Sequence, residues 1–126
     1  MATEGSILDA IYDNEAQRAR QVFLAQPVGG GKVIDSTWVQ MMDQARRMAR
    51  HLQDRGLRPG DRIAMLSKNC AHFFMAELAI WMAGGTAVAI FPTETAETVR
   101  YVLANATPRG YQRALGLNQH WDQPTR

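Results

Sequence analysis

The sequence predicts an α/β fold in which an early β-hairpin is followed by a parallel βαβ unit flanked by helices. Three observations predict this fold. A glycine-rich segment separates two short apolar runs near the N-terminus, a strongly amphipathic helix pattern follows, and two further apolar runs enclose a stretch long enough for a helical crossover. A crossover of that length allows the two enclosing strands to run parallel in one sheet.

The composition is that of one globular domain. The chain has 126 residues, and 46% of them are hydrophobic, which is enough for one buried core and too many for a disordered chain. Cys70 is the only cysteine, so no disulfide and no CxxC metal site can form within one chain. The first residues lack the basic and apolar regions of a secretory signal, and we therefore expect a cytoplasmic location.

The charge balance does not predict a nucleic-acid partner. Lysine and arginine number 14 against 12 acidic residues. The main local excess consists of five arginines near Asp54, with no aromatic side chains between them to stack on bases: Arg46, Arg47, Arg50, Arg55 and Arg58. We interpret these arginines as the solvated face of a helix.

The N-terminal part predicts a helix and then a hairpin. Residues from Ser6 to about Arg18 form an amphipathic pattern typical of a short helix. The apolar centre of residues 21–25 predicts a strand, the segment from Pro27 to Gly31 predicts a turn, and residues 32–35 predict the returning strand. This hairpin is the first sheet element of the predicted fold.

The clearest helix pattern runs from Trp38 to about Arg55. Thr37 and Gln40 are spaced as a capping box at its start. Gly56 is placed to adopt the left-handed conformation that ends helices, and a Pro-Gly turn follows. The apolar residues expected to face the core are Trp38, Met42, Ala45, Ala49 and Leu52.

The following segment predicts the βαβ unit. A buried strand is expected over residues 62–66, a mostly buried helix over 70–83 with Asn69 as its N-cap, and a second buried strand over 86–91. A last helix over 96–105, capped by Thr95, completes the pattern. Charged and helix-breaking residues interrupt this region before it reaches the length of a membrane span, so no transmembrane segment is expected.

Chemically reactive residues occur without the spacing of a catalytic or metal site. The segment 29–32, Gly-Gly-Gly-Lys, lacks the hydroxyl residue and the helix of a phosphate-binding loop, and we interpret it as a hairpin turn. Cys70 is expected to be a packed thiol, Ser67 lacks a nucleophile elbow, and Glu77 is expected to be partly exposed. The histidines at 51, 72 and 120 do not have metal-ligand spacing, and His72 fits a helix rim or cap. We therefore predict no catalytic, cofactor-binding or metal-ligating residue in this chain.

An ordered set of motifs in the middle of the chain carries a specific resemblance. Residues 56–64 read G-L-R-P-G-D-R-I-A, and S-K-N, L-A-I and P-T follow at 67–69, 78–80 and 92–93. Over about residues 5–108 the chain resembles the opening of the adenylate-forming (AMP-dependent synthetase/ligase) superfamily, with the closest likeness to acyl-CoA synthetases, the fatty-acid–CoA ligases. The resemblance implies that these residues are scaffold in the N-terminal domain.

The resemblance also implies a reaction for the full-length family member. A carboxylic acid and ATP give an acyl-adenylate and pyrophosphate, and coenzyme A then displaces AMP, with Mg²⁺ neutralising phosphate charge. The family's phosphate loop, acidic ribose and metal residues and catalytic lysine have no match here. Residues 1–109 are therefore interpreted as an incomplete segment of an AMP-binding domain that is inactive alone. Its exposed apolar surface would favour self-association or docking to the remainder of the ligase.

Residues 110–126 depart from the family pattern. The run Y-Q-R-A-L-G over 111–116 is too polar for the buried strand that the family would have there, so an irregular tail is expected, together with a truncation or a shifted reading frame near Arg109. The alternative interpretation is a non-enzymatic α/β interaction module, or a subunit that pairs with a separate chain. The side chains expected to dock on a partner are Phe73, Phe74, Trp81 and Trp121.

Overall fold

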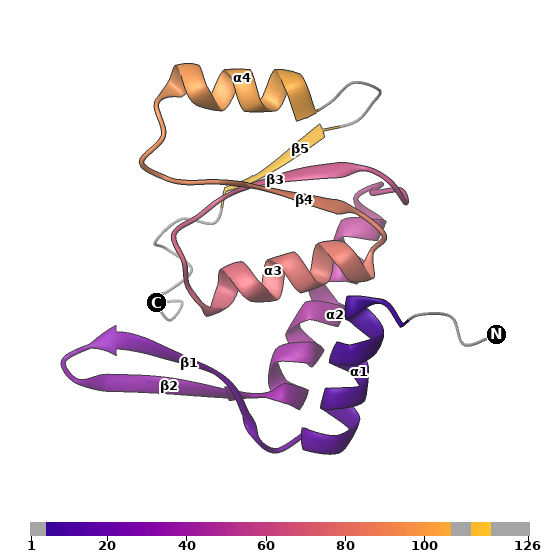
Figure 1. The fold of residues 1–126 in the computed structure, drawn as a ribbon, viewed down its shortest axis with the longest axis vertical. Coiled ribbons are helices and arrows are strands. Elements are labelled where there is room, and N and C mark those ends of the chain that lie inside the picture. The colour runs from indigo at the N-terminus through magenta and orange to yellow at the C-terminus, as the bar shows by residue number, and fades with distance from the viewer. Residues whose placement is uncertain (1–4, 107–111, 117–126) are drawn as a thin grey trace.

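The computed structural model describes residues 5–106 and 112–116 and confirms the α/β fold class (Figure 1). Strands β1 and β2 form an antiparallel hairpin, and the second sheet has the strand order β4-β3-β5. The elements are α1 (Ile7–Arg18), β1 (Val22–Gly29), β2 (Lys32–Thr37), α2 (Trp38–Asp54), β3 (Arg62–Leu66), α3 (Ala71–Met82), β4 (Thr86–Ile90), α4 (Ala96–Ala106) and β5 (Gln112–Gly116).

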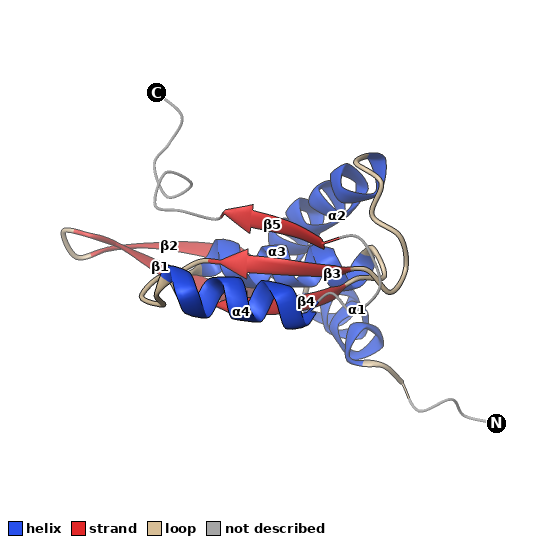
Figure 2. Cartoon of the chain, turned by 90° about the horizontal axis from the view of Figure 1, so that it is seen from above, coloured by secondary structure: helices blue, strands red, loops and turns tan. Residues whose placement is uncertain are grey.

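The parallel sheet is the middle layer of the molecule. Helices α2 and α3 lie on one side of it and α4 lies on the other (Figures 1 and 2). Strand β3 is central and pairs in parallel with β4, with Ile63 opposite Ala87. The two predicted strands thus form the expected parallel pair with a helix between them. Among the described residues, no helix is long and apolar enough to cross a membrane.

The hairpin strands are longer than the sequence predicts. Strand β1 continues through Pro27 as far as Gly29, so the predicted turn is confined to the glycines at the tip. Gly29, Gly30 and Gly31 have φ angles of +94°, +62° and +75°, which glycine adopts at little cost. Pro27 is tolerated within the strand because, among the described strands, β1 pairs with β2 alone, and the N–H that proline lacks is not needed on an unpaired edge.

Both ends of α2 follow the local sequence signals. The backbone N–H of Gln40 donates to Thr37 Oγ1 at 3.3 Å, and the N–H of Thr37 donates to Gln40 Oε1 at 3.0 Å, which confirms the capping box. At the other end, Gly56 has φ +95° and donates to the carbonyl of Gln53, while Leu57 donates to the carbonyl of Leu52. These two bonds form a Schellman motif.

Helix α1 has a capping box of its own but contributes no buried residue. Ser6 and Asp9 bond reciprocally, with the Ser6 N–H donating to Asp9 Oδ2 at 2.8 Å. Arg46 of α2 forms a two-pronged ion pair with Glu15 and lies 5.8 Å from the centre of the Tyr12 ring. These contacts attach α1 to α2 largely through its polar side, while its apolar side chains are half-buried or exposed.

The N-cap of α3 differs from the prediction. Cys70 occupies the cap position rather than Asn69, and its side chain makes no capping hydrogen bond. Cap assignment from sequence favours asparagine because its side chain accepts from the helix N-terminus. Here the first helical N–H, that of Ala71, donates to Gln26 of β1, and the N–H of Phe73 donates to the carbonyl of Cys70.

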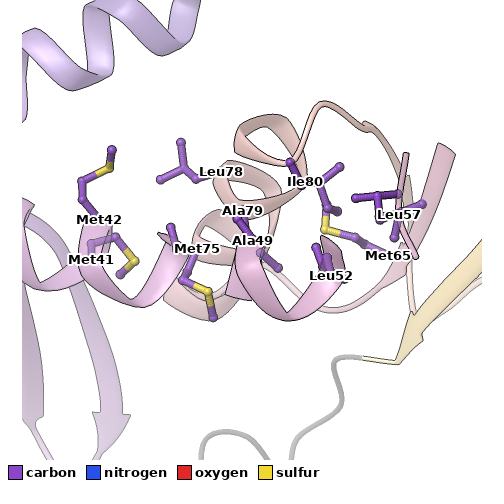
Figure 3. Packing of buried hydrophobic residues seen from close by; sticks show 14 residues of the cluster. Met41, Met42, Ala49, Leu52, Leu57, Met65, Met75, Leu78, Ala79 and Ile80 are labelled. Carbon is purple, nitrogen blue, oxygen red and sulfur yellow. The ribbon is translucent and has the colours of Figure 1, made fainter. Parts of the chain in front are cut away.

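The main core lies between α2, α3 and β3, and four buried methionines, Met41, Met42, Met65 and Met75, fill much of it (Figure 3). Met42, Ile63, Met65 and Ile80 are the largest side chains that are completely buried. Met41 is also buried, whereas Trp38 is half-buried and stacks on Phe23 with 3.9 Å between ring centres. The predicted core positions of α2 are therefore confirmed, apart from Trp38, whose ring packs on the base of the hairpin.

The expectation of an irregular tail over 110–126 is wrong for residues 112–116. These residues form β5, which pairs in parallel with β3, with Ala64 opposite Ala114. The reason is that β4 occupies only one edge of β3, and the other edge offers backbone hydrogen bonds whatever the polarity of the incoming side chains. Polarity disfavours a buried central strand, but β5 is an edge strand. The remainder of the predicted tail lies outside the described residues.

Candidate functional site

The family motifs meet at the amino end of the parallel sheet. The backbone N–H of Gly60 donates to the carbonyl of Gly84 at 2.9 Å, and the N–H of Thr86 donates to the carbonyl of Asp61 at 2.8 Å. These bonds join the loop before β3 to the loop before β4. The P-G-D-R residues 59–62 thus contact the loop that holds the glycine pair 84–85, and these contacts stabilise the fold.

Space as well as conformation requires glycine where these loops cross. Gly84 has φ +85°, and a Cβ added there would lie 3.3 Å from Pro59 Cα. A Cβ at Gly85 would lie 3.1 Å from Ile80 Cγ2 and 3.2 Å from the carbonyl oxygen of Asp61. Such contacts are tighter than most Cβ contacts, so a side chain there would push the neighbouring atoms away by a few tenths of an ångström, and the glycine pair lets the two backbone segments approach.

The carboxyl end of the sheet is where α/β proteins bind ligands, and it is the natural place to look for chemistry. Buried Ser67 follows β3, but its hydroxyl donates to the carbonyl of Lys68 at 2.8 Å. Its Oγ also lies 3.9 Å from the sulfur of Cys70, which is buried. The hydroxyl is therefore engaged with the chain's own backbone, and the thiol is packed as expected from the sequence.

Gln26 of β1 links the hairpin to the start of α3. Its Oε1 accepts a 2.8 Å hydrogen bond from the backbone N–H of Ala71, although the two residues are 45 positions apart. Its Nε2 donates to the carbonyl of Pro27 at 2.9 Å. A glutamine from the hairpin thus accepts from the first N–H of α3, one of the four N–H groups at a helix start that have no partner within the helix. Sequence reasoning missed this residue because the contact joins distant parts of the chain.

Replacing Gln26 with alanine is expected to lower the free energy of unfolding by about 1–2 kcal/mol, since the N–H of Ala71 loses its acceptor. Urea unfolding followed by circular dichroism measures the change. Gln26→Glu is the matched control, because it keeps an acceptor and places negative charge at a helix N-terminus. Equal losses for the two variants would contradict the role of Gln26 as a cap.

The other residues considered from the sequence do not come together as a site. Glu77 is half-buried on α3, as expected, and His72 is half-buried in the first turn of the same helix. Lys32 begins β2 beside the glycine turn, where no helix starts. His120 lies outside the described residues. Within the described ranges, no three His, Cys, Asp or Glu side chains are grouped so that they could hold a metal ion.

The arginine cluster consists largely of paired side chains. Arg47 lies 2.7 Å from Asp43 and Arg50 lies 3.2 Å from Asp54, each one turn apart on α2. The hydrogen bond that Arg46 donates to the Glu15 carboxylate raises the pKa of Arg46 above its usual value. These pairs support the interpretation of a solvated helix face, because their charge is already balanced by neighbouring carboxylates.

Comparison with protein families gives one match, which spans most of the chain. The family described as AMP-binding enzyme matches residues 12–113. The match covers the hairpin, both motif loops and the parallel sheet, and it reaches into β5.

Two curated relatives and one solved structure illustrate the range of similar proteins. The probable nonribosomal peptide synthetase CymA of Salinispora arenicola is 38% identical over 73 residues, which are 58% of this chain and 1% of CymA. A substituted indenyl-propanoyl:CoA ligase of Rhodococcus jostii is 40% identical over 60 residues, 48% of this chain and 12% of the ligase. The fatty acid AMP ligase of Legionella pneumophila has a TM-score of 0.79 at 22% identity, with coverage of 91% of this chain and 20% of the ligase.

The chain therefore spans only a small part of each of these proteins, at most a fifth of their length.

Proposed function

Because this chain belongs to the AMP-binding enzyme family, a family of adenylate-forming ligases, we propose that it is the N-terminal framework segment of an ATP-dependent acyl-CoA synthetase and forms no acyl-adenylate alone. In the complete enzyme a carboxylate oxygen of the acid would attack the α-phosphorus of ATP and release pyrophosphate. The thiol of coenzyme A would then attack the acyl carbon and release AMP.

One observation carries this proposal. The family match extends over residues 12–113, yet the matched motifs that the structure describes are engaged in backbone contacts and packing. The Gly60 and Gly84 loops hold each other, and the Ser67 hydroxyl bonds to the neighbouring carbonyl. These residues build the sheet on which a nucleotide site would stand.

This proposal assigns no Mg²⁺ or ATP ligand to the described residues. Over residues 5–106 and 112–116, no three His, Cys, Asp or Glu side chains are grouped so that they could hold a metal ion. In this proposal the groups that bind ATP and Mg²⁺ belong to other parts of the enzyme. No step of the reaction is assigned to a side chain of this segment.

The proposal also names the acceptor of the acyl group, coenzyme A, and the cellular location, the cytoplasm. The 40% identity to a CoA ligase supports coenzyme A as the acceptor, and the structural likeness to a fatty acid AMP ligase is compatible with a fatty acid substrate. In this proposal, peptide synthetases and CoA ligases both activate a carboxylate. The two classes of protein then differ in the acceptor of the activated acyl group. A single buried, reduced cysteine supports a cytoplasmic location.

Isothermal titration of the isolated chain with ATP and Mg²⁺ is expected to give no saturable binding tighter than about 1 mM. Pyrophosphate release in the presence of palmitate is expected to stay at the level of buffer. The Legionella fatty acid AMP ligase serves as the positive control under the same conditions. Saturable, Mg²⁺-dependent ATP binding, or acid-dependent pyrophosphate release, would refute the proposal.

A further inference from the structure

Six exposed apolar side chains belong to elements on one side of the molecule, which we call the strand-end face. On this side β3 and β4 end, α3 begins and the β1–β2 hairpin projects (Figures 1 and 2). Each of the six is between 40% and 59% exposed. They are Val28, Val33 and Ile34 of the hairpin, Leu66 and Phe91 at the ends of β3 and β4, and Phe74 near the start of α3.

The backbone on this face is also open to a partner. Among the described strands, β1 and β2 pair only with each other, so both outer edges of the hairpin offer unpaired backbone groups. A two-stranded hairpin is marginally stable by itself. Strand β4 is likewise an edge of the parallel sheet. Unpaired strand edges next to exposed apolar side chains are typical of surfaces that another protein segment covers.

We propose that the strand-end face docks the remainder of an AMP-binding domain, and this inference rests on the proposed function. Ligands of α/β sheets bind beyond the carboxyl ends of the strands, and the Ser67 hydroxyl that follows β3 there already donates to the carbonyl of Lys68. In the proposed function, the groups that hold the nucleotide come from a segment lying against this face. The Legionella ligase, of which the chain spans 20%, has four-fifths of its length left to supply such a segment.

A second copy of this chain is the other conceivable occupant. It would cover the apolar side chains, but it would bring the same strand ends and no new group for a nucleotide. The structure therefore favours a partner with different residues over a symmetric dimer.

The test measures binding without nucleotide. The probe is the Legionella fatty acid AMP ligase from which the segment matched by this chain has been deleted, purified and shown by circular dichroism to be folded. Biolayer interferometry is expected to detect a complex with the isolated chain. Ile34→Asp and Phe91→Asp should each weaken it at least about tenfold, because a charge would be buried in an apolar contact.

Ile7→Asp is the matched control. Ile7 is more exposed than any of the face residues, at 68%, but it lies at the start of α1 on the opposite side of the molecule, where an aspartate suits the helix N-terminus (Figure 1). Its affinity should stay within about twofold of the wild type. Circular dichroism should show that all three variants fold, because each residue is exposed.

Three results would overturn the docking proposal. The first is the absence of a complex with the folded ligase segment. The second is a weakening of the complex by Ile7→Asp equal to that by the face variants. The third is a dimer of the chain that Phe91→Asp dissociates and that does not bind the ligase segment. Each leaves the proposed function standing if the isolated chain still fails to bind ATP. Conversely, ATP binding by the isolated chain would refute the proposed function while the complex is still observed.

Discussion

Replacing Met42 with alanine is expected to lower the free energy of unfolding by about 2–5 kcal/mol. Met42 is completely buried between α2 and α3, and its side chain lies among other core residues of both helices (Figure 3). Removing the thioether arm loses burial of apolar surface and leaves a cavity that two packed helices cannot fully close. Small domains are stabilised by only about 5–15 kcal/mol. A loss of this size would therefore move the midpoint of the cooperative unfolding transition to a low urea concentration.

Two further variants identify the cause of the loss. Met42→Leu keeps most of the volume and should cost less than about 1.5 kcal/mol. Met48→Ala removes the same group from a half-buried position on the same helix and should cost clearly less than Met42→Ala. Urea unfolding followed by fluorescence of the tryptophans measures all three. A loss for Met48→Ala as large as that for Met42→Ala would contradict the placement of the core.

Gly84→Ala is expected to lower the free energy of unfolding by about 2–4 kcal/mol. One part of the loss comes from φ +85°, which a residue with a Cβ adopts only at a cost. The other part comes from the contact with Pro59, whose Cα would lie 3.3 Å from the new Cβ. Gly84 also ends α3 in a Schellman motif, since it donates to Trp81 and Gly85 donates to Ile80.

Gly60→Ala separates the two parts. Gly60 has nearly the same backbone angle, φ +87°, but a Cβ there would meet nothing within 4 Å. Its substitution should therefore cost only the conformational part, about 1–2 kcal/mol. The difference between the two variants, measured by urea unfolding, gives the cost of pushing the two loops apart. Equal costs would show that the crossing of the loops tolerates a methyl group.

Much of the fold could be predicted because its signals are local. The capping box of Thr37 and Gln40 and the helix end at Gly56 depend on residues within one turn, and both occur as the spacing predicts. The parallel pairing of β3 and β4 followed from their apolar runs and the length of the helix between them. The bounds of α2 and α4 agree with the predicted ranges to within one residue.

The features that sequence reasoning missed are contacts between distant segments. Nothing near Gln26 in the sequence indicates that it caps α3, because its partner lies 45 positions away. The polar run over 111–116 indicates no buried strand, yet residues 112–116 pair with the edge of β3 that β4 does not occupy. The hairpin extended past Pro27 for a related reason, since an edge strand needs no donor there.

For the candidate site, the sequence indicated the family through residues whose role is structural. Pro59, Gly60 and Asp61 lie in the loop before β3, and the glycine pair 84–85 lies in the loop before β4. Two backbone segments approach closely there, so the geometry of the loops in this chain favours glycine at these positions. Chemistry at the carboxyl end of the parallel sheet does not determine which residues occupy these loop positions.

The crossing of these two loops has a consequence for how genomes are read. A search that recognises the glycine and proline signature detects chains able to build this corner, whether or not they can activate an acid. Gene counts based on the signature would include scaffolds among the enzymes. Inventories of synthetases would be more accurate if they also required the residues that bind the nucleotide. The loop crossing itself does not indicate whether those residues are present.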